Sequence, residues 1–131
     1  MSKPLGPYTP VVRAGDFIIV SGQGGLLDGT KVDGGLVPET EQTMKNIESL
    51  LATMGATMRD VVKTTCYLTD MGDYVRFNAA YVAAFGEPRA ARSFFAVAEL
   101  AAASVAGVEV RAHQTARSLL CRLPGAGSCT H

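Results

Sequence analysis

The first apolar stretches of the chain are two short runs divided by turn residues. Apolar side chains fill residues 11–12 and 17–20, and the intervening Ala14-Gly15-Asp16 has the composition of a tight turn. This pattern predicts a β-hairpin. Six of the 14 glycines follow between residues 22 and 35, which predicts a loop whose backbone approaches another group closely or takes positive φ.

Two segments change to a period of three and four residues, which predicts amphipathic helices over residues 39–54 and 74–85. Acidic residues at the start of the first segment favour the positive end of the helix dipole, and Gly55 ends it. Asp73 can cap the second, which Gly86 ends. The apolar stripes are Met44, Ile47, Leu50, Leu51 and Met54 in the first helix, and Tyr74, Phe77, Tyr81 and Phe85 in the second.

Three further apolar runs, rich in β-branched and aromatic residues, predict strands over residues 61–69, 93–100 and 105–112. The order β-β-α-β-α-β-β predicts an α+β domain with one mixed sheet and two helices on one face. The other face of the sheet has no helix to cover it. An apolar face left bare in this way suggests contact with another subunit.

Composition is that of one globular domain, expected over residues 3–115 with a tail at 116–131. The chain has 131 residues, 47% apolar and 18% charged, with 12 basic against 12 acidic side chains. Zero net charge argues against a nucleic-acid binder that relies on basic excess. No apolar run approaches the length of a membrane span, and the N-terminus lacks the apolar core of a signal peptide. We therefore expect a cytoplasmic protein with no membrane partner.

The chain has few of the residues that common catalytic sites require. The three cysteines lack metal-ligand spacing, and the two histidines are His113 and His131, so neither a metal site nor a Ser-His-Asp arrangement is expected. No stretch matches a phosphate-cradling glycine pattern, and we predict no cofactor. Cys66 lies mid-strand, where a buried structural role is favoured over a nucleophilic one.

Three polar residues stand where packing does not require them. Arg92 precedes an apolar strand and suits either bidentate binding of a carboxylate or a salt bridge at the strand end. Asn78 interrupts an apolar helical face, so its amide needs a partner, either a backbone group or a ligand. Ser21 opens the glycine-rich loop, where its hydroxyl can meet a substrate or cap a turn.

Several short motifs occur in one order along residues 3–115. They are Gly6-Pro7-Tyr8, Ser21-Gly22-Gln23, Lys63-Thr64-Thr65, Phe77-Asn78-Ala79-Ala80-Tyr81, Ala91-Arg92-Ser93 and Val108-Glu109-Val110. By these motifs taken together, the chain resembles the RidA/YjgF family of reactive-intermediate deaminases. The resemblance implies a chorismate-mutase-like fold and a barrel-like homotrimer, with the sheets facing inward and the active sites in clefts between subunits. It also implies hydrolysis of 2-imino and 2-enamino acids, such as 2-iminopropanoate and 2-aminoacrylate, to 2-oxo acids and ammonia.

The resemblance assigns roles to individual residues. Arg92 falls on the arginine that clamps the substrate carboxylate, and Tyr8 on a tyrosine that walls the pocket. Ser21 and Gly22 match the strand end where a hydroxyl and a backbone amide approach the ligand. Asn78 matches the family's helix asparagine, and Phe94 stands where many members have a cysteine.

The last strand departs from the family pattern. Deaminating members read approximately I-E-I-E-A, and the second glutamate positions the attacking water; here Arg111 takes that position. Glu109 lies two residues earlier on the same face, and a two-residue shift in register would bring it into the role. The alternatives are therefore a deaminase that uses Glu109, a trimer that binds small carboxylates without turnover, or a specialised pathway enzyme. A ribonuclease is a weaker hypothesis because the net charge is zero.

Overall fold

The structure is a computed structural model that describes residues 4–86 and 89–113. The predicted tail at 116–131 lies outside the described residues, together with the predicted end of the domain at residue 115. Cys121, Cys129 and His131 also lie outside them.

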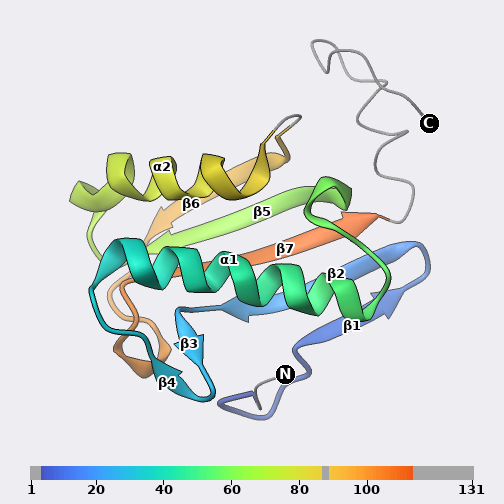
Figure 1. The fold of residues 1–131 in the computed structure, drawn as a ribbon, viewed down its shortest axis with the longest axis horizontal. Helices are drawn as coiled ribbons and strands as arrows, with labels where there is room; N and C mark the ends of the chain where they lie inside the picture. Colours follow the sequence, from blue (N-terminus) through green and yellow to red (C-terminus); the bar gives the residue numbers. More distant parts are fainter. Residues whose placement is uncertain (1–3, 87–88, 114–131) are drawn as a thin grey trace.

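A five-stranded mixed sheet carries two helices on one face (Figure 1). The strand order is β1-β2-β7-β5-β6; β5 and β6 are parallel, and the other neighbours are antiparallel. The strands are β1 (Val11–Ala14), β2 (Phe17–Gln23), β5 (Val61–Leu68), β6 (Ala91–Ala96) and β7 (Ala106–His113), and the helices are α1 (Leu36–Thr53) and α2 (Tyr74–Phe85). The predicted α+β class, the mixed sheet and the helices on one face are confirmed.

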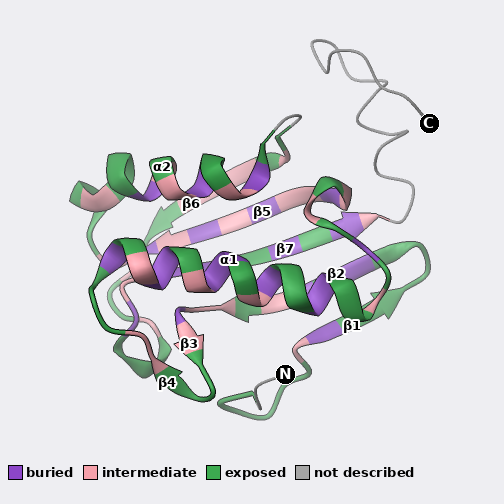
Figure 2. Ribbon diagram, in the orientation of Figure 1, coloured by how far each residue is buried: buried purple, intermediate pink, exposed green. Residues whose placement is uncertain are grey.

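The core lies between the helices and the sheet, and Figure 2 shows buried purple segments along both helices and along the strands. From Val108 to Ala112 strand β7 alternates, so that Val108 and Val110 are buried while Glu109 and Arg111 are exposed. Ile47 and Phe77 of the predicted helical stripes are fully buried. The apolar side of the strand and the apolar sides of the two helices therefore pack into the same layer.

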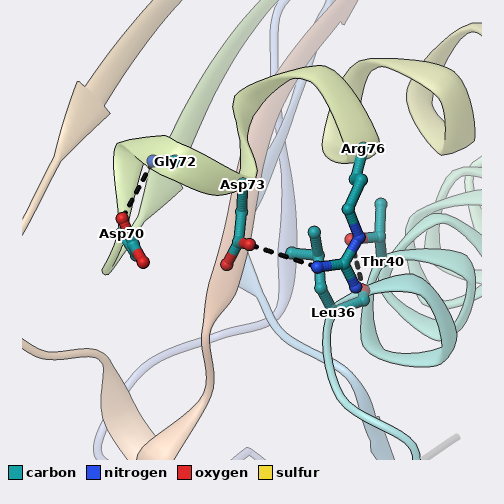
Figure 3. A network of polar contacts seen from close by, with 6 residues as sticks. All are labelled: Leu36, Thr40, Asp70, Gly72, Asp73 and Arg76. Atoms are coloured by element: carbon teal, nitrogen blue, oxygen red, sulfur yellow. Dashed lines mark hydrogen bonds and ion pairs between the residues drawn. The ribbon is translucent and has the colours of Figure 1, made fainter.

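Helix α2 spans the predicted residues, but α1 begins earlier than predicted and the predicted cap of α2 is absent. Helix α1 starts at Leu36, three residues earlier, because Pro38 lies in the first turn, where a helix requires no backbone N–H. Asp73 does not cap α2: its carboxylate accepts from Arg76 at 3.4 Å. The capping carboxylate is Asp70, which accepts from the Gly72 backbone N–H at 2.8 Å and starts a short 3-10 turn, η2 (Met71–Asp73) (Figure 3).

The predicted strand at 93–100 is instead Ala91–Ala96. Among the described strands it lies at the sheet edge and pairs with β5 alone, from Lys63↔Ala91 to Leu68↔Ala96. Because β5 ends at Leu68, the residues after Ala96 have no neighbouring strand to extend along. The chain turns away through η3 (Ala101–Ala103), where Ala102 and Ala103 have φ of 58° and 55°, in the left-handed region that alanine rarely adopts.

The glycine-rich loop contains an unpredicted small hairpin, β3 (Leu26–Leu27) with β4 (Thr30–Lys31). Gly25 explains the expected close approach, since a Cβ atom there would lie 2.6 Å from Cα of Glu39. Glu39 is itself buried, and its Oε1 accepts from the backbone N–H of Val105 at 3.1 Å. The start of α1 is thereby attached to Val105, which lies between η3 and β7. Another short 3-10 turn, η1 (Met58–Asp60), precedes β5.

Candidate functional site

Arg92 is held on the helix-covered face of the sheet. Its Cα is paired with Thr64, whose hydroxyl bonds to Tyr81 of α2, so both side chains point toward the helix. The guanidinium donates from Nη1 to Oδ1 of Asn78 at 2.8 Å and from Nη2 to the hydroxyl of Tyr74 at 3.0 Å. No carboxylate among the described residues pairs with Arg92. The guanidinium is fixed by neutral groups and keeps its charge available.

Aromatic rings surround the same guanidinium. Its Cζ lies 4.9 Å from the ring centroid of Tyr81, 5.0 Å from that of Phe94 and 5.6 Å from that of Tyr74. Phe94 also meets Phe77 edge to face at 5.2 Å, which fastens it to the core. The rings restrict the orientation of Arg92 and leave the edge of its planar group for a ligand.

Cys66 lies beneath this cluster, paired with Phe94 and fully buried. Burial raises the pKa of its thiol from 9.0 to about 11, although the positive charge of Arg92 acts in the opposite direction. The predicted buried role is confirmed. A thiol that resists ionisation is a poor nucleophile at neutral pH.

A second group of predicted residues lies at the other end of the strand order. Gly22 is in β2, and Tyr8 is in the segment before β1; both line a hollow of about 420 Å³ between the N-terminal segment, the glycine-rich loop and α1. The Ser21 hydroxyl donates to the Thr9 carbonyl at 2.7 Å. Because its proton is committed, Ser21 can serve a ligand only as an acceptor. A Cβ on Gly22 would meet nothing within 4 Å, so space is open above its backbone.

Glu109 and Arg111 form a third group on the open face of the sheet. Glu109 is paired with Thr65 and Arg111 with Lys63, and these residues line a small hollow of about 80 Å³. The Tyr67 hydroxyl donates to Oε1 of Glu109 at 3.2 Å. Partial burial, followed by the charge of Glu109, raises the pKa of Tyr67. Glu109 is thus a hydrogen-bonded carboxylate exposed to solvent.

One protomer does not bring the three groups together. Strands β7 and β5 separate β2 from β6, which places Gly22 and Arg92 about 14 Å apart across the sheet. Glu109 and Arg92 project from opposite faces. The structure therefore joins Arg92, Asn78 and Phe94 in one set and Tyr8 and Gly22 in another. Gly22 lies in the bulge of β2 opposite Glu109 of β7, whereas Arg92 lies apart from both.

The tyrosines around Arg92 were not predicted as site residues, although the sequence carried a signal for them. Tyr74, Asn78 and Tyr81 share one face of a helix at spacings of four and three residues. The amide oxygen of Asn78 accepts from the Arg92 side chain, a partner that was not among the two alternatives predicted for it. Among the described residues, no three or more His, Cys, Asp or Glu side chains are placed to hold a metal ion.

Comparison with known proteins places this arrangement in a family. A model of the family described as Endoribonuclease L-PSP matches residues 1–115. The chain is 38% identical over 112 residues to a mouse protein named 2-iminobutanoate/2-iminopropanoate deaminase, covering 84% of this chain and 83% of that protein. The chain belongs to the RidA/YjgF family.

Further relatives agree with this assignment. A RutC family protein of Pyrococcus horikoshii is 37% identical over 100 residues, which cover 75% of this chain and 79% of that protein. The crystal structure of RidA from an Antarctic Psychrobacter has a TM-score of 0.82 at 30% identity, covering 86% of this chain and 92% of that one. The predicted RidA/YjgF membership is confirmed. None of the described helices is both long and apolar enough to cross a membrane.

Proposed function

We propose that this RidA/YjgF protein hydrolyses 2-imino and 2-enamino acids, such as 2-iminopropanoate and 2-aminoacrylate, to 2-oxo acids and ammonia. The observation that carries the proposal is the Arg92 cluster, in which neutral partners orient a guanidinium without neutralising it. Such a group matches a carboxylate next to an imine carbon. The mouse relative is named for deamination of substrates of this class. The family model is named for ribonuclease activity, but the zero net charge of this chain supports a small-molecule substrate.

The reaction needs orientation and proton transfer more than a strong nucleophile. Water adds to the C=N carbon, the nitrogen takes up a proton, and the carbinolamine loses ammonia to leave C=O. In this proposal Arg92 binds the carboxylate, while Tyr8 and the Gly22 backbone line the pocket around the imine group of the substrate. Glu109, already a hydrogen-bonded carboxylate, is the candidate to orient the water.

The proposed site is shared between copies of the chain in a homotrimer. Its separate parts support this arrangement, since no single protomer places Arg92 beside Gly22 or Glu109. The open sheet face also exposes Phe17, Ile19 and Phe95, which are 44%, 39% and 52% accessible. Contact between copies would cover these apolar side chains and bring the Arg92 cluster of one copy near Gly22 of a neighbouring copy.

The test is formation of 2-oxo acid from freshly generated 2-aminoacrylate, with the spontaneous hydrolysis subtracted. We expect wild type to accelerate the reaction and Arg92→Ala to lose at least about 100-fold of kcat/KM, because the carboxylate loses a charged bidentate partner. A wild-type rate no higher than that of Arg92→Ala would reject the proposed function.

A second candidate is binding of small carboxylates without turnover, and Arg111 is the observation that favours it. Arg111 and Lys63 place two positive side chains beside Glu109 on the open face. According to the family resemblance, deaminating members have a second glutamate at the position of Arg111. Arg111→Glu discriminates between the candidates. A large gain of deamination would identify the present protein as a binder or a specialised enzyme, whereas unchanged or lower activity would support Glu109 in the existing reaction.

A further inference from the structure

Tyr74 presents an unused hydrogen-bond donor next to the carboxylate-binding arginine. It is the first residue of α2, and its hydroxyl oxygen accepts from Nη2 of Arg92 at 3.0 Å. Within residues 4–86 and 89–113, the hydroxyl proton of Tyr74 meets no acceptor. The side chain is 38% accessible, so the proton faces a place that a ligand can reach.

The hydrogen-bond capacity of Arg92 limits where a carboxylate can bind. A guanidinium has five N–H donors in one plane, and Asn78 takes one on Nη1 while Tyr74 takes one on Nη2. The rings of Tyr81 and Phe94 lie within 5.0 Å of Cζ and occupy the space around the flat group. A carboxylate must therefore approach along the edge of the guanidinium, where the remaining N–H groups point.

We infer that the Tyr74 hydroxyl is a second carboxylate-binding donor, which binds one substrate oxygen while the free N–H groups of Arg92 bind the carboxylate. The hydroxyl accepts from Nη2, so its own proton remains to be donated to an anion beside that nitrogen. The resulting pocket is selective for 2-imino and 2-oxo acids over the corresponding amides, because a neutral amide offers one weaker acceptor in place of two charged oxygens. This inference rests on the proposed function.

Local packing holds Tyr74 in place for this role. Its ring meets Phe94 edge to face, with centroids 4.8 Å apart. Asn78 lies one helical turn further along α2, so both partners of Arg92 project from the same side of one helix. The two contacts therefore form a rigid support, and loss of the Tyr74 hydroxyl leaves the ring packing intact.

The test is Tyr74→Phe, assayed by calorimetric binding of pyruvate and of its carboxamide to the purified full-length protein. We expect Kd for pyruvate to rise about tenfold, the effect of losing one hydrogen bond to a charged group, and Kd for the carboxamide to change less than about twofold. In the deamination assay the change falls on KM, with kcat retained. Val75→Ser is the control, since Val75 is the next residue of α2 and is 78% accessible.

The possible outcomes separate the inference from the function on which it rests. If wild type neither binds pyruvate nor forms 2-oxo acid, the proposed function fails. If wild type does both and Tyr74→Phe matches it, or loses affinity equally for both ligands, the role of Tyr74 as a carboxylate donor is overturned. As a second measurement, ¹⁵N-arginine NMR of the pyruvate complex should show slow rotation at Nη2 of Arg92 in wild type and faster rotation in Tyr74→Phe; equal rotation also overturns it.

Discussion

The Arg92 region and the Tyr8–Gly22 region differ in what each can offer a ligand. Around Arg92, side chains from β6 and α2 are bonded to one another and enclose a charge. Around Gly22, the side-chain proton of Ser21 is committed to the Thr9 carbonyl, and the lining residues leave an open hollow of about 420 Å³. One region supplies fixed charge and the other supplies space. A complete binding site for a small anion requires both.

The largest expected effect is that of a charge-preserving change in the first region. Arg92→Lys should lower kcat/KM for 2-aminoacrylate about 100-fold, because an ammonium cannot span Asn78 and Tyr74 while also binding a carboxylate side-on. The measurement is 2-oxo acid formation. Arg59→Lys, at an exposed arginine of η1, is the control and should match wild type. A value for Arg92→Lys within about threefold of wild type would mean that charge alone suffices there.

Combining one defect from each region tests whether the two regions complete one site between copies. Arg92→Ala removes the charge, and Gly22→Leu fills the hollow at a position where nothing lies within 4 Å of a Cβ. Each variant alone should be inactive, whereas random mixing by joint refolding should restore roughly a quarter of wild-type activity, since some neighbouring pairs then contain one intact half each. Activity of the mixture no greater than that of the separate variants would contradict a shared site.

Two glycines of the second region should respond differently to alanine. Gly25→Ala should lower the free energy of unfolding by about 2–3 kcal/mol, because the new Cβ would lie 2.6 Å from Glu39 Cα. Gly22→Ala should change it by less than about 0.5 kcal/mol while weakening pyruvate binding. Urea denaturation measures the first quantity and calorimetry the second. Equal stability losses would show that Gly22 serves the fold rather than the hollow.

The smallest effect concerns the thiol beneath the first region. Below about pH 9 the Cys66 thiol is protonated in both folded and unfolded chains; above it the unfolded chain ionises first, because burial raises the pKa of the folded thiol to about 11. The free energy of unfolding should therefore fall by about 1–2 kcal/mol more in wild type than in Cys66→Ala between pH 9 and pH 11. Parallel denaturation curves for the two proteins over that range would argue against a protonated buried thiol.

Much of the fold could be predicted from the sequence because local periodicity determines it. The alternation around Glu109 and Arg111 and the helical stripe through Ile47 both indicated the correct faces. The errors arose where distant partners decide the outcome. Strand β6 stops at Ala96 because its neighbour ends at Leu68. Asp73 stands at the N-cap position of α2 but its carboxylate accepts from Arg76, and the side-chain cap is made one short turn earlier, by Asp70 at the start of η2.

The candidate site was predictable residue by residue but not as an arrangement. Arg92 and Asn78 each stood out as polar residues in apolar surroundings, yet nothing in the sequence indicated that they bond to each other, since this contact depends on α2 crossing over β6. Tyr74 was identified only as part of an apolar stripe, because a hydrophobic pattern does not distinguish the ring of a tyrosine from its hydroxyl. Glu109 and Arg92 lie on opposite faces because they pair with consecutive residues of β5, Thr65 and Thr64, and local patterns do not contain this register.

The position of β7 in the sheet has a consequence for folding during synthesis. It is the last of the described strands along the chain, yet it lies between β2 and β5, with pairs as distant in sequence as Phe17↔His113. Until residues 106–113 have left the ribosome, the N-terminal hairpin and the β5–α2–β6 unit share no strand. The hairpin and the β5–α2–β6 unit can therefore join in one sheet only after β7 has been synthesised. Contacts of such long range slow folding.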